Sequence, residues 1–290
     1  MAYNLFLDFC RPVSVDEVTA YFESRRWYRT LCDVVEYWNP NTGVDFSFNV
    51  VHDSHRSIDG AFGVNFQMHS LRPHVFCLEA EHEIRACANR FSATVFDPVS
   101  GSMMSDEEIS TEALLRGWKN SGEIECRERL QGTGATYPVY AMPARQIGRS
   151  WHWNYQFEAS ERRFRWRVTV PHARLFAVNG VLYTGIVWYD SIPDLIPDVD
   201  VVIVVRHAMS LNEWHAFHEY CLLRQSDLDA VLAPLTDYGL PMLARRPLFH
   251  ITPAQVRGFV SSLVPSTDHI AAVPLGRVLD QELFIQHLDL

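Results

Sequence analysis

The residues best suited to chemistry lie in the second half of the chain, where histidines and a glutamate lie close together. The set consists of His207, His215, His218 and Glu219. On a helix, His215 and Glu219 would share one face at positions i and i+4, and imidazole and carboxylate are common zinc ligands. The order H-x-x-H-E nevertheless differs from the HExxH order of zinc hydrolases. We therefore expect no bound metal.

A second group of carboxylates lies in a proline-bearing segment before a strongly apolar run. Its members are Asp190, Asp194, Asp198 and Asp200. Such a loop can bind a divalent cation or supply an acid and a base. Aspartates in turns more often hydrogen-bond the nearby backbone, and the order of an EF-hand loop is absent. The alternative function is thus a metal-dependent hydrolase that uses Asp190, Asp194, Asp198, His215, His218 and Glu219.

Other catalytic and cofactor-binding motifs are missing from the sequence. It contains no G-x-S-x-G, no Walker A glycine loop and no G-x-G-x-x-G after a predicted strand. Of the 25 basic residues only Lys119 is a lysine, and it lies in a polar segment. The arginine cluster of residues 162–167, which surrounds Trp166, is the one candidate for binding nucleic acid, and the acidic remainder of the chain argues against it, so we expect no nucleic-acid partner. We assign no catalytic residue and expect no cofactor.

Charge is distributed unevenly along the chain. The net charge is −10, and residues 1–135 hold 20 acids against 12 bases, whereas residues 136–290 hold 15 against 13. An acidic half repels nucleic acid and anionic lipid and attracts a basic protein. The partner-binding residues we expect lie at the start of a predicted helix: Asp106, Glu107, Glu108 and Glu112.

Targeting signals are also missing. No run approaches the ~18 apolar residues of a membrane span, and the start MAYNLFLDFCRP has no basic segment and includes Asp8. The six cysteines form no CxxC pair, and we expect them to be reduced and mostly buried: Cys10, Cys32, Cys77, Cys87, Cys126 and Cys221. These features predict a cytoplasmic protein without a membrane partner.

The first half of the sequence predicts a compact α+β unit. Strands are expected at 4–10, 34–38, 44–50, 62–68, 75–78 and 93–96, and helices after Ser14, through 81–91 and from Ser105. Glu79, Glu81, His82 and Glu83 are interpreted as carboxylates and a histidine at a helix start. The glycine-containing stretch 121–136 predicts a boundary between domains 1–133 and 134–290.

The segment from Trp151 to Glu158 (W-H-W-N-Y-Q-F-E) allows two interpretations. Alternation would pair it as a hairpin strand with residues 164–170. Helical spacing fits as well, and Pro143 is a good first residue for a helix through about Arg162. We favour the helix, with Trp151, Trp153 and Tyr155 mostly buried as core residues.

The rest of the second half is rich in predicted strands. A hairpin is expected across Asn179-Gly180, a strand covered on both faces over 200–206, and another strand over 220–223. Helices are expected after Ser226, through 227–235, and from Pro253 to Val264. The fold class is therefore α+β, with two α+β domains, each a mainly antiparallel sheet packed by helices.

Several strings resemble a group of bacterial proteins. W-H-W-N-Y (151–155), I-V-W (186–188), I-P-D-V-D (196–200), R-P-H-V-F-C-L-E-A-E (72–81) and L-R-G-W (115–118) are similar to segments of uncharacterised bacterial cytosolic proteins associated with interbacterial toxin–immunity loci. The resemblance brings no catalytic residues. Together with the acidic half, it implies a non-catalytic cytosolic immunity protein that sequesters a basic toxin.

Overall fold

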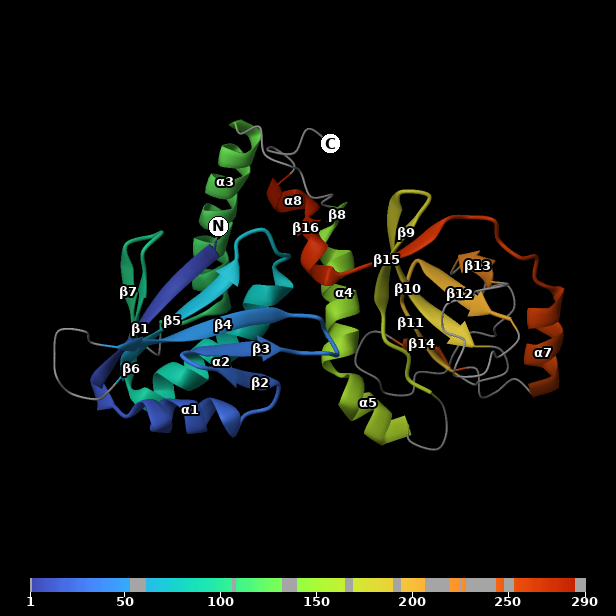
Figure 1. The fold of residues 1–290 in the computed structure, drawn as a ribbon. Helices are drawn as coiled ribbons and strands as arrows, with labels where there is room; N and C mark the ends of the chain where they lie inside the picture. Colours follow the sequence, from blue (N-terminus) through green and yellow to red (C-terminus); the bar gives the residue numbers. More distant parts are fainter. Residues whose placement is uncertain are drawn as a thin grey trace. The chain divides into compact units, whose positions relative to one another are not determined.

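The structure is a computed structural model that describes residues 2–52, 61–105, 108–131, 140–164, 169–189, 194–206, 220–224, 226–227, 244–247 and 253–284. The chain divides into two compact units (Figure 1). Unit 1 contains the chain up to Ala144 and again from Leu275 onward, and unit 2 contains Arg145–Pro274. Both units are α+β, as the sequence patterns predict.

Unit 1 is built on an antiparallel sheet of seven strands in the order β2-β3-β4-β5-β1-β6-β7. The strands are β1 (Ala2–Val13), β2 (Tyr28–Leu31), β3 (Val34–Trp38), β4 (Asp45–His52), β5 (Ala61–His69), β6 (Ala93–Asp97) and β7 (Ser102–Met104). Alternation sets the buried face: Phe46, Phe48 and Val50 of β4 are all buried. The predicted pairing of β3 with β4 is confirmed.

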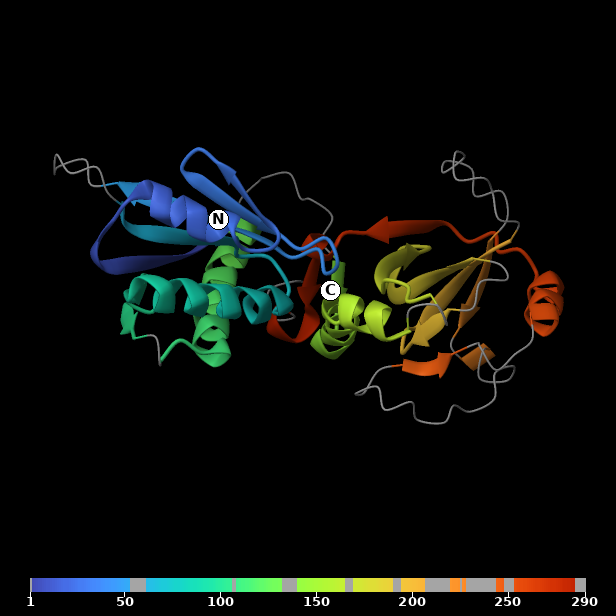
Figure 2. The ribbon, with the colours of Figure 1, turned by 90° about the horizontal axis from the view of Figure 1, so that it is seen from below.

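Three helices cover one face of this sheet: α1 (Val15–Glu23), α2 (Val75–Phe91) and α3 (Thr111–Gln131). Figure 2 shows α2 and α3 on the same side of the strands. The Ser14 hydroxyl caps α1 by accepting a hydrogen bond from the Glu17 amide at 3.1 Å, as predicted. The later segment adds a 3₁₀ turn (Leu275–Arg277), β16 (Val278–Asp280), which pairs parallel with β8 (Tyr140–Met142), and α8 (Gln281–Phe284).

Three expectations for unit 1 are corrected. Residues 75–78 are not a strand but the first turn of α2, because a short apolar run can equally begin a buried helix. Helix α3 begins at Thr111 rather than Ser105, since Ser105 and Glu108 form a hydrogen-bonded turn ahead of it. Residues 121–131, the first part of the glycine-containing stretch for which a domain boundary was predicted, belong to α3, and Ser121 and Cys126 lie buried on its inner face.

Unit 2 has a five-stranded sheet in the order β13-β12-β10-β9-β15. Its strands are β9 (Arg174–Val178), β10 (Val181–Tyr189), β12 (Val201–Val205), β13 (Tyr220–Arg224) and β15 (Ile270–Val273); β11 (Leu195–Pro197) pairs separately with β14 (Ala244–Pro247). The predicted hairpin is confirmed, with positive φ at Asn179 (49°) and Gly180 (85°). Every residue of β12 is buried, which confirms a strand covered on both faces.

Helices pack on the first face of the unit 2 sheet, around a core that includes Trp153, Phe164, Trp188 and Val260. They are α4 (Ala144–Tyr155), α5 (Phe157–Phe164) and α7 (Pro253–Ser262). The second face carries a smaller cluster centred on Phe176, Val178 and Ile203. The helical interpretation of residues 143–162 is thus correct, with one interruption at Gln156.

The burial predicted for the aromatic segment is only partly correct. Trp153 is buried and Trp151 half-buried, but Tyr155 is 44% exposed. Ile147, Ser150 and Trp153 form the inner face of α4. Trp151 and Tyr155 follow a different helical row, where their rings stack with centroids 5.0 Å apart.

All six cysteines are free, and four of them are buried, as expected for most of them; Cys10 and Cys32 are exposed. No helix in the described part of the chain has the length and apolar character required to cross a membrane. Residues 165–168 and most of the predicted helix 227–235 lie outside the described residues.

Candidate functional sites

Of the four acids predicted to bind a partner, the two that the structure describes are engaged in local contacts. Asp106 and Glu107 lie outside the described residues. The Glu108 carboxylate accepts hydrogen bonds from the Ser105 amide (2.7 Å) and hydroxyl (3.0 Å), and these contacts lower the pKa of Glu108. Glu112 is exposed and pairs with Arg116 one turn later, at 3.4 Å.

The carboxylates of the alternative hydrolase site have different partners. Asp190, His207, His215, His218 and Glu219 lie outside the described residues. Asp198 forms an ion pair with Arg149 at 2.5 Å. Asp200 accepts hydrogen bonds from the Thr184 amide (2.8 Å) and hydroxyl (2.7 Å) and so joins β10 to the start of β12. Within the described ranges, no three His, Cys, Asp or Glu residues are grouped so that they could hold a metal ion.

Asp194 instead lines a cavity of about 360 Å³ on the second face of the unit 2 sheet. Residues of all five strands line it, among them Phe176, Val187, Ile203 and Ile270. Tyr189 and Tyr220 add two further aromatic side chains. The polar groups at the cavity come from Thr169, His172, Arg174 and Asp194.

Asp194 is the unusual group of this cavity. Asp194 is only 3% exposed, and its Oδ1 has no hydrogen-bond partner among the described residues. Burial raises the pKa of Asp194 from 3.8 to about 7, against the opposing effect of a hydrogen bond from Thr169. A bridge between Thr169 and Asp194, together with a 2.8 Å hydrogen bond from the Leu195 amide to the Thr169 carbonyl, holds the backbone in place.

The aromatic segment of α4 builds the wall that carries His172. The Trp153 indole donates to the Pro171 carbonyl at 2.7 Å. The Asn154 side chain donates to the Ala173 carbonyl (2.7 Å) and accepts from the Ala173 amide (2.9 Å). The segment 171–173 is therefore fastened on both sides of His172. These contacts assign Trp153 and Asn154 a positioning role.

His172 was not predicted as a site residue. The Phe157 ring stacks on its imidazole with centroids 3.8 Å apart. Burial, and to a smaller extent the nearby Arg174, lower the pKa of His172, so the ring is neutral at pH 7. A single histidine beside a single arginine carries no recognisable motif in the sequence.

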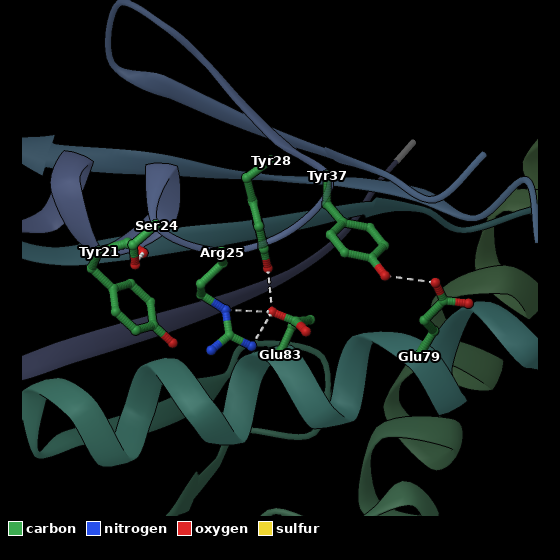
Figure 3. A network of polar contacts seen from close by, with 7 residues as sticks. All are labelled: Tyr21, Ser24, Arg25, Tyr28, Tyr37, Glu79 and Glu83. Atoms are coloured by element: carbon green, nitrogen blue, oxygen red, sulfur yellow. Dashed lines mark hydrogen bonds and ion pairs between the residues drawn. The ribbon is translucent and has the colours of Figure 1, made fainter. Parts of the chain in front are cut away.

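Two carboxylates of α2 form a second polar region, in unit 1 (Figure 3). Glu79 is 2% exposed and accepts hydrogen bonds from the Tyr37 hydroxyl (2.7 Å), the Asn39 amide (2.6 Å) and the Thr42 hydroxyl (3.0 Å). Asn39 and Thr42 belong to the turn between β3 and β4. Glu79 therefore fixes that turn against the helix, which is a structural role.

One turn further along α2, Glu83 accepts from the Arg25 guanidinium (2.6 and 3.0 Å) and from the Tyr28 hydroxyl (2.8 Å). Burial and the neighbouring Glu83 raise the pKa of Tyr28, which keeps the phenol protonated. The sequence pattern had placed Glu79 and Glu83 at the start of a helix. This prediction is wrong, because α2 begins at Val75 and both residues lie inside it. Both side chains point from α2 toward the sheet, where Glu79 meets Tyr37 and Glu83 meets Arg25 and Tyr28 (Figure 3).

The seven-stranded sheet has a second face, opposite α1, α2 and α3, and none of the described helices of unit 1 covers it. Phe6, Phe96 and Met103 lie side by side on it across β1, β6 and β7, and Phe6 and Met103 are 37% and 57% exposed. Trp38, 62% exposed, borders a hollow of about 480 Å³ that Glu36 also lines. We call this surface the open face; its exposed acids are Asp8, Glu36 and Asp45.

The division into units sharpens the charge asymmetry. Unit 1 contains 23 acids and 13 bases, a net charge of −10. Unit 2 contains 12 acids and 12 bases, a net charge of zero. All of the net charge of the chain therefore belongs to the unit that carries the open face.

The fold and these sites define an α+β protein with one acidic, open-faced unit and one neutral unit that holds a cavity. Comparisons with known protein families, curated proteins and solved structures found no match. The resemblance to proteins of toxin–immunity loci stays a prediction.

Proposed function

We propose that this chain is a non-catalytic binding protein whose unit 1 recognises a basic protein through the open face. The observation that carries the proposal is the charge partition, −10 for unit 1 against zero for unit 2. A surface of one sign steers an oppositely charged protein toward it and raises the association rate.

The open face also has the composition of an interface. Protein interfaces combine aromatic and methionine side chains at their centre with polar side chains at the rim. Phe6 and Phe96 stack at a centroid distance of 6.5 Å, and Trp38 stands exposed beside a hollow. Exposed tryptophans are frequent anchors in protein complexes.

In its specific form, the proposal is a cytoplasmic immunity protein that sequesters a basic toxin. The resemblance of the chain to proteins of toxin–immunity loci suggests this partner. The alternative, a metal-dependent hydrolase, is less well supported. Two of its carboxylates already have partners, since Asp198 pairs with Arg149 and Asp200 accepts a hydrogen bond from Thr184.

The test is a charge reversal on the open face with a matched control in unit 2. A partner captured by the tagged chain is identified, purified and titrated by surface plasmon resonance. Glu36→Arg should slow association several-fold and weaken its salt dependence, because it removes steering charge. Glu161→Arg makes the same change on an exposed position of α5 and should leave binding unchanged.

A second variant addresses the contact itself. Trp38→Ala should speed dissociation at least tenfold if the exposed ring is an anchor. The proposal would be overturned if the affinity changed neither with salt concentration nor in Glu36→Arg and Trp38→Ala. A partner whose contacts lie wholly in unit 2 would overturn it as well.

A further inference from the structure

We propose that the cavity of unit 2 binds a small aromatic amine, with the Asp194 carboxylate receiving its ammonium group. This site is separate from the open face and does not depend on the function proposed for unit 1. The inference stands on three features: the size of the cavity, its aromatic and aliphatic wall, and the Asp194 carboxyl in that wall, whose Oδ1 is buried and has no donor among the described residues. Because Oδ1 is closed to solvent, the ammonium reaches it by rotation of the Asp194 side chain toward the cavity.

The size of the cavity sets the size of the ligand. At about 360 Å³ it lies at the small end of the roughly 300–1,000 Å³ typical of ligand pockets. One aromatic ring with a short side chain fits this space. Phe176, Val187, Ile203 and Ile270 offer such a ring an apolar surface on the sheet.

The buried carboxyl selects the polar group of the ligand. An ionised carboxylate only accepts hydrogen bonds, and an ammonium offers three donors and the opposite charge. Aromatic rings also attract cations through their faces, and Phe176, Tyr189 and Tyr220 line the same cavity. A ligand carboxylate would be repelled by Asp194, and an alcohol would lack the charge.

The other titratable and charged groups at the cavity do not compete for this role. His172 is neutral at pH 7 because burial lowers its pKa. The Tyr220 hydroxyl donates to the Asp268 carbonyl, and Tyr189 and Arg174 are exposed, where solvent screens the Arg174 charge.

Affinity should therefore follow the ionisation of Asp194. Its pKa of about 7 means that the carboxylate form grows roughly tenfold between pH 6 and pH 8. An alkylammonium, with a pKa near that of lysine at about 10.4, stays charged over the same range. Amine affinity should rise about tenfold from pH 6 to pH 8 through the ionisation of Asp194.

The experiment is calorimetric titration of the full chain with four probes at pH 6 and pH 8. 2-Phenylethylamine should bind saturably and about tenfold more tightly at pH 8. 2-Phenylethanol and phenylacetate test the need for positive charge, and n-butylamine represents a lysine side chain. Equal or tighter binding of any of these three would overturn the proposal, as would absence of saturable binding by 2-phenylethylamine.

Three variants locate the site. Asp194→Asn should weaken 2-phenylethylamine binding at least tenfold at pH 8 and abolish its pH dependence. Glu161→Gln removes an exposed charge of the same unit and should bind normally. Ala272→Trp fills the cavity mouth without removing a charge and should block binding. Normal binding by the folded Ala272→Trp chain would place the amine elsewhere and refute the assignment, even if Asp194→Asn failed to fold.

Discussion

Glu79 and Asp194 are both almost fully buried carboxylates, yet their surroundings differ. Glu79 accepts hydrogen bonds from three side chains of unit 1. Asp194 has an oxygen without a donor among the described residues. A satisfied buried carboxylate fixes the structure around it, whereas an unsatisfied one carries a desolvation cost that a ligand can relieve.

That cost predicts a pH-dependent stability for unit 2. The folded pKa of Asp194, about 7, lies above its ordinary value of 3.8, so the folded state binds more protons between these values. Stability should fall as pH rises from about 4 to about 7 and then level off. The corresponding free energy is roughly 4 kcal/mol at most.

Asp194→Asn removes this titration. Compared with the wild type, the variant should gain stability from pH 4.5 to pH 8, by up to a few kcal/mol. Urea unfolding at the two pH values measures the change. A difference between variant and wild type that is the same at both pH values would contradict a raised Asp194 pKa.

The sequence could name Asp194 but not distinguish it. Asp190, Asp194, Asp198 and Asp200 look equivalent along the chain. Their roles depend on which long-range partners they meet, such as Arg149 for Asp198. His172 was missed for the same reason, because its wall is set by Trp153 and Asn154 of α4 rather than by its sequence neighbours.

At the scale of elements, local rules predicted what local forces determine. The Ser14 cap, the Asn179-Gly180 turn and the alternation of β4 are all confirmed. Errors arose where two periods fitted one run, as at residues 75–78. They arose also where a glycine, Gly122, lies inside a helix whose tertiary packing outweighs its low propensity.

Helix α4 gives the prediction at this scale. Asn154→Ala would leave both the amide and the carbonyl of Ala173 buried without their side-chain partner. Each unsatisfied group costs about 1–3 kcal/mol, so we expect a loss of roughly 2–4 kcal/mol in urea unfolding. Asn154→Asp should cost less on the acceptor side, because it retains Oδ1 for the Ala173 amide.

The control for this prediction is Glu161→Ala, an exposed change on α5 that should stay within about 0.5 kcal/mol of wild type. Cavity binding of 2-phenylethylamine should weaken in Asn154→Ala, since the wall that carries His172 loses its fastening. A variant as stable as the control would show that Asn154 does not hold the 171–173 segment.

On the scale of the whole molecule, unit 1 is assembled from both ends of the chain. The Asp280 side chain is fully buried, and it accepts hydrogen bonds from the His74 amide (2.6 Å) and lies 2.7 Å from His74 Nδ1. Arg72 donates to the Gly276 carbonyl nearby. No local pattern in the sequence announces this return, because pairing across some 200 residues depends on tertiary structure.

This return predicts that unit 1 and unit 2 respond differently to loss of the C-terminal segment. Asp280→Asn removes the charged acceptor at the first turn of α2 and should destabilise unit 1 by about 2–4 kcal/mol. Ending the chain at Pro274 should destabilise it further, because β8 also loses its partner β16.

Residues 145–274, which are contiguous, should fold alone with the melting temperature that unit 2 has in the full chain. Calorimetry of the three proteins, with Glu161→Gln as an exposed control in unit 2, measures these changes. If the C-terminal changes lowered the melting temperatures of unit 1 and unit 2 equally, the C-terminal segment would stabilise the chain as a whole and not unit 1 in particular.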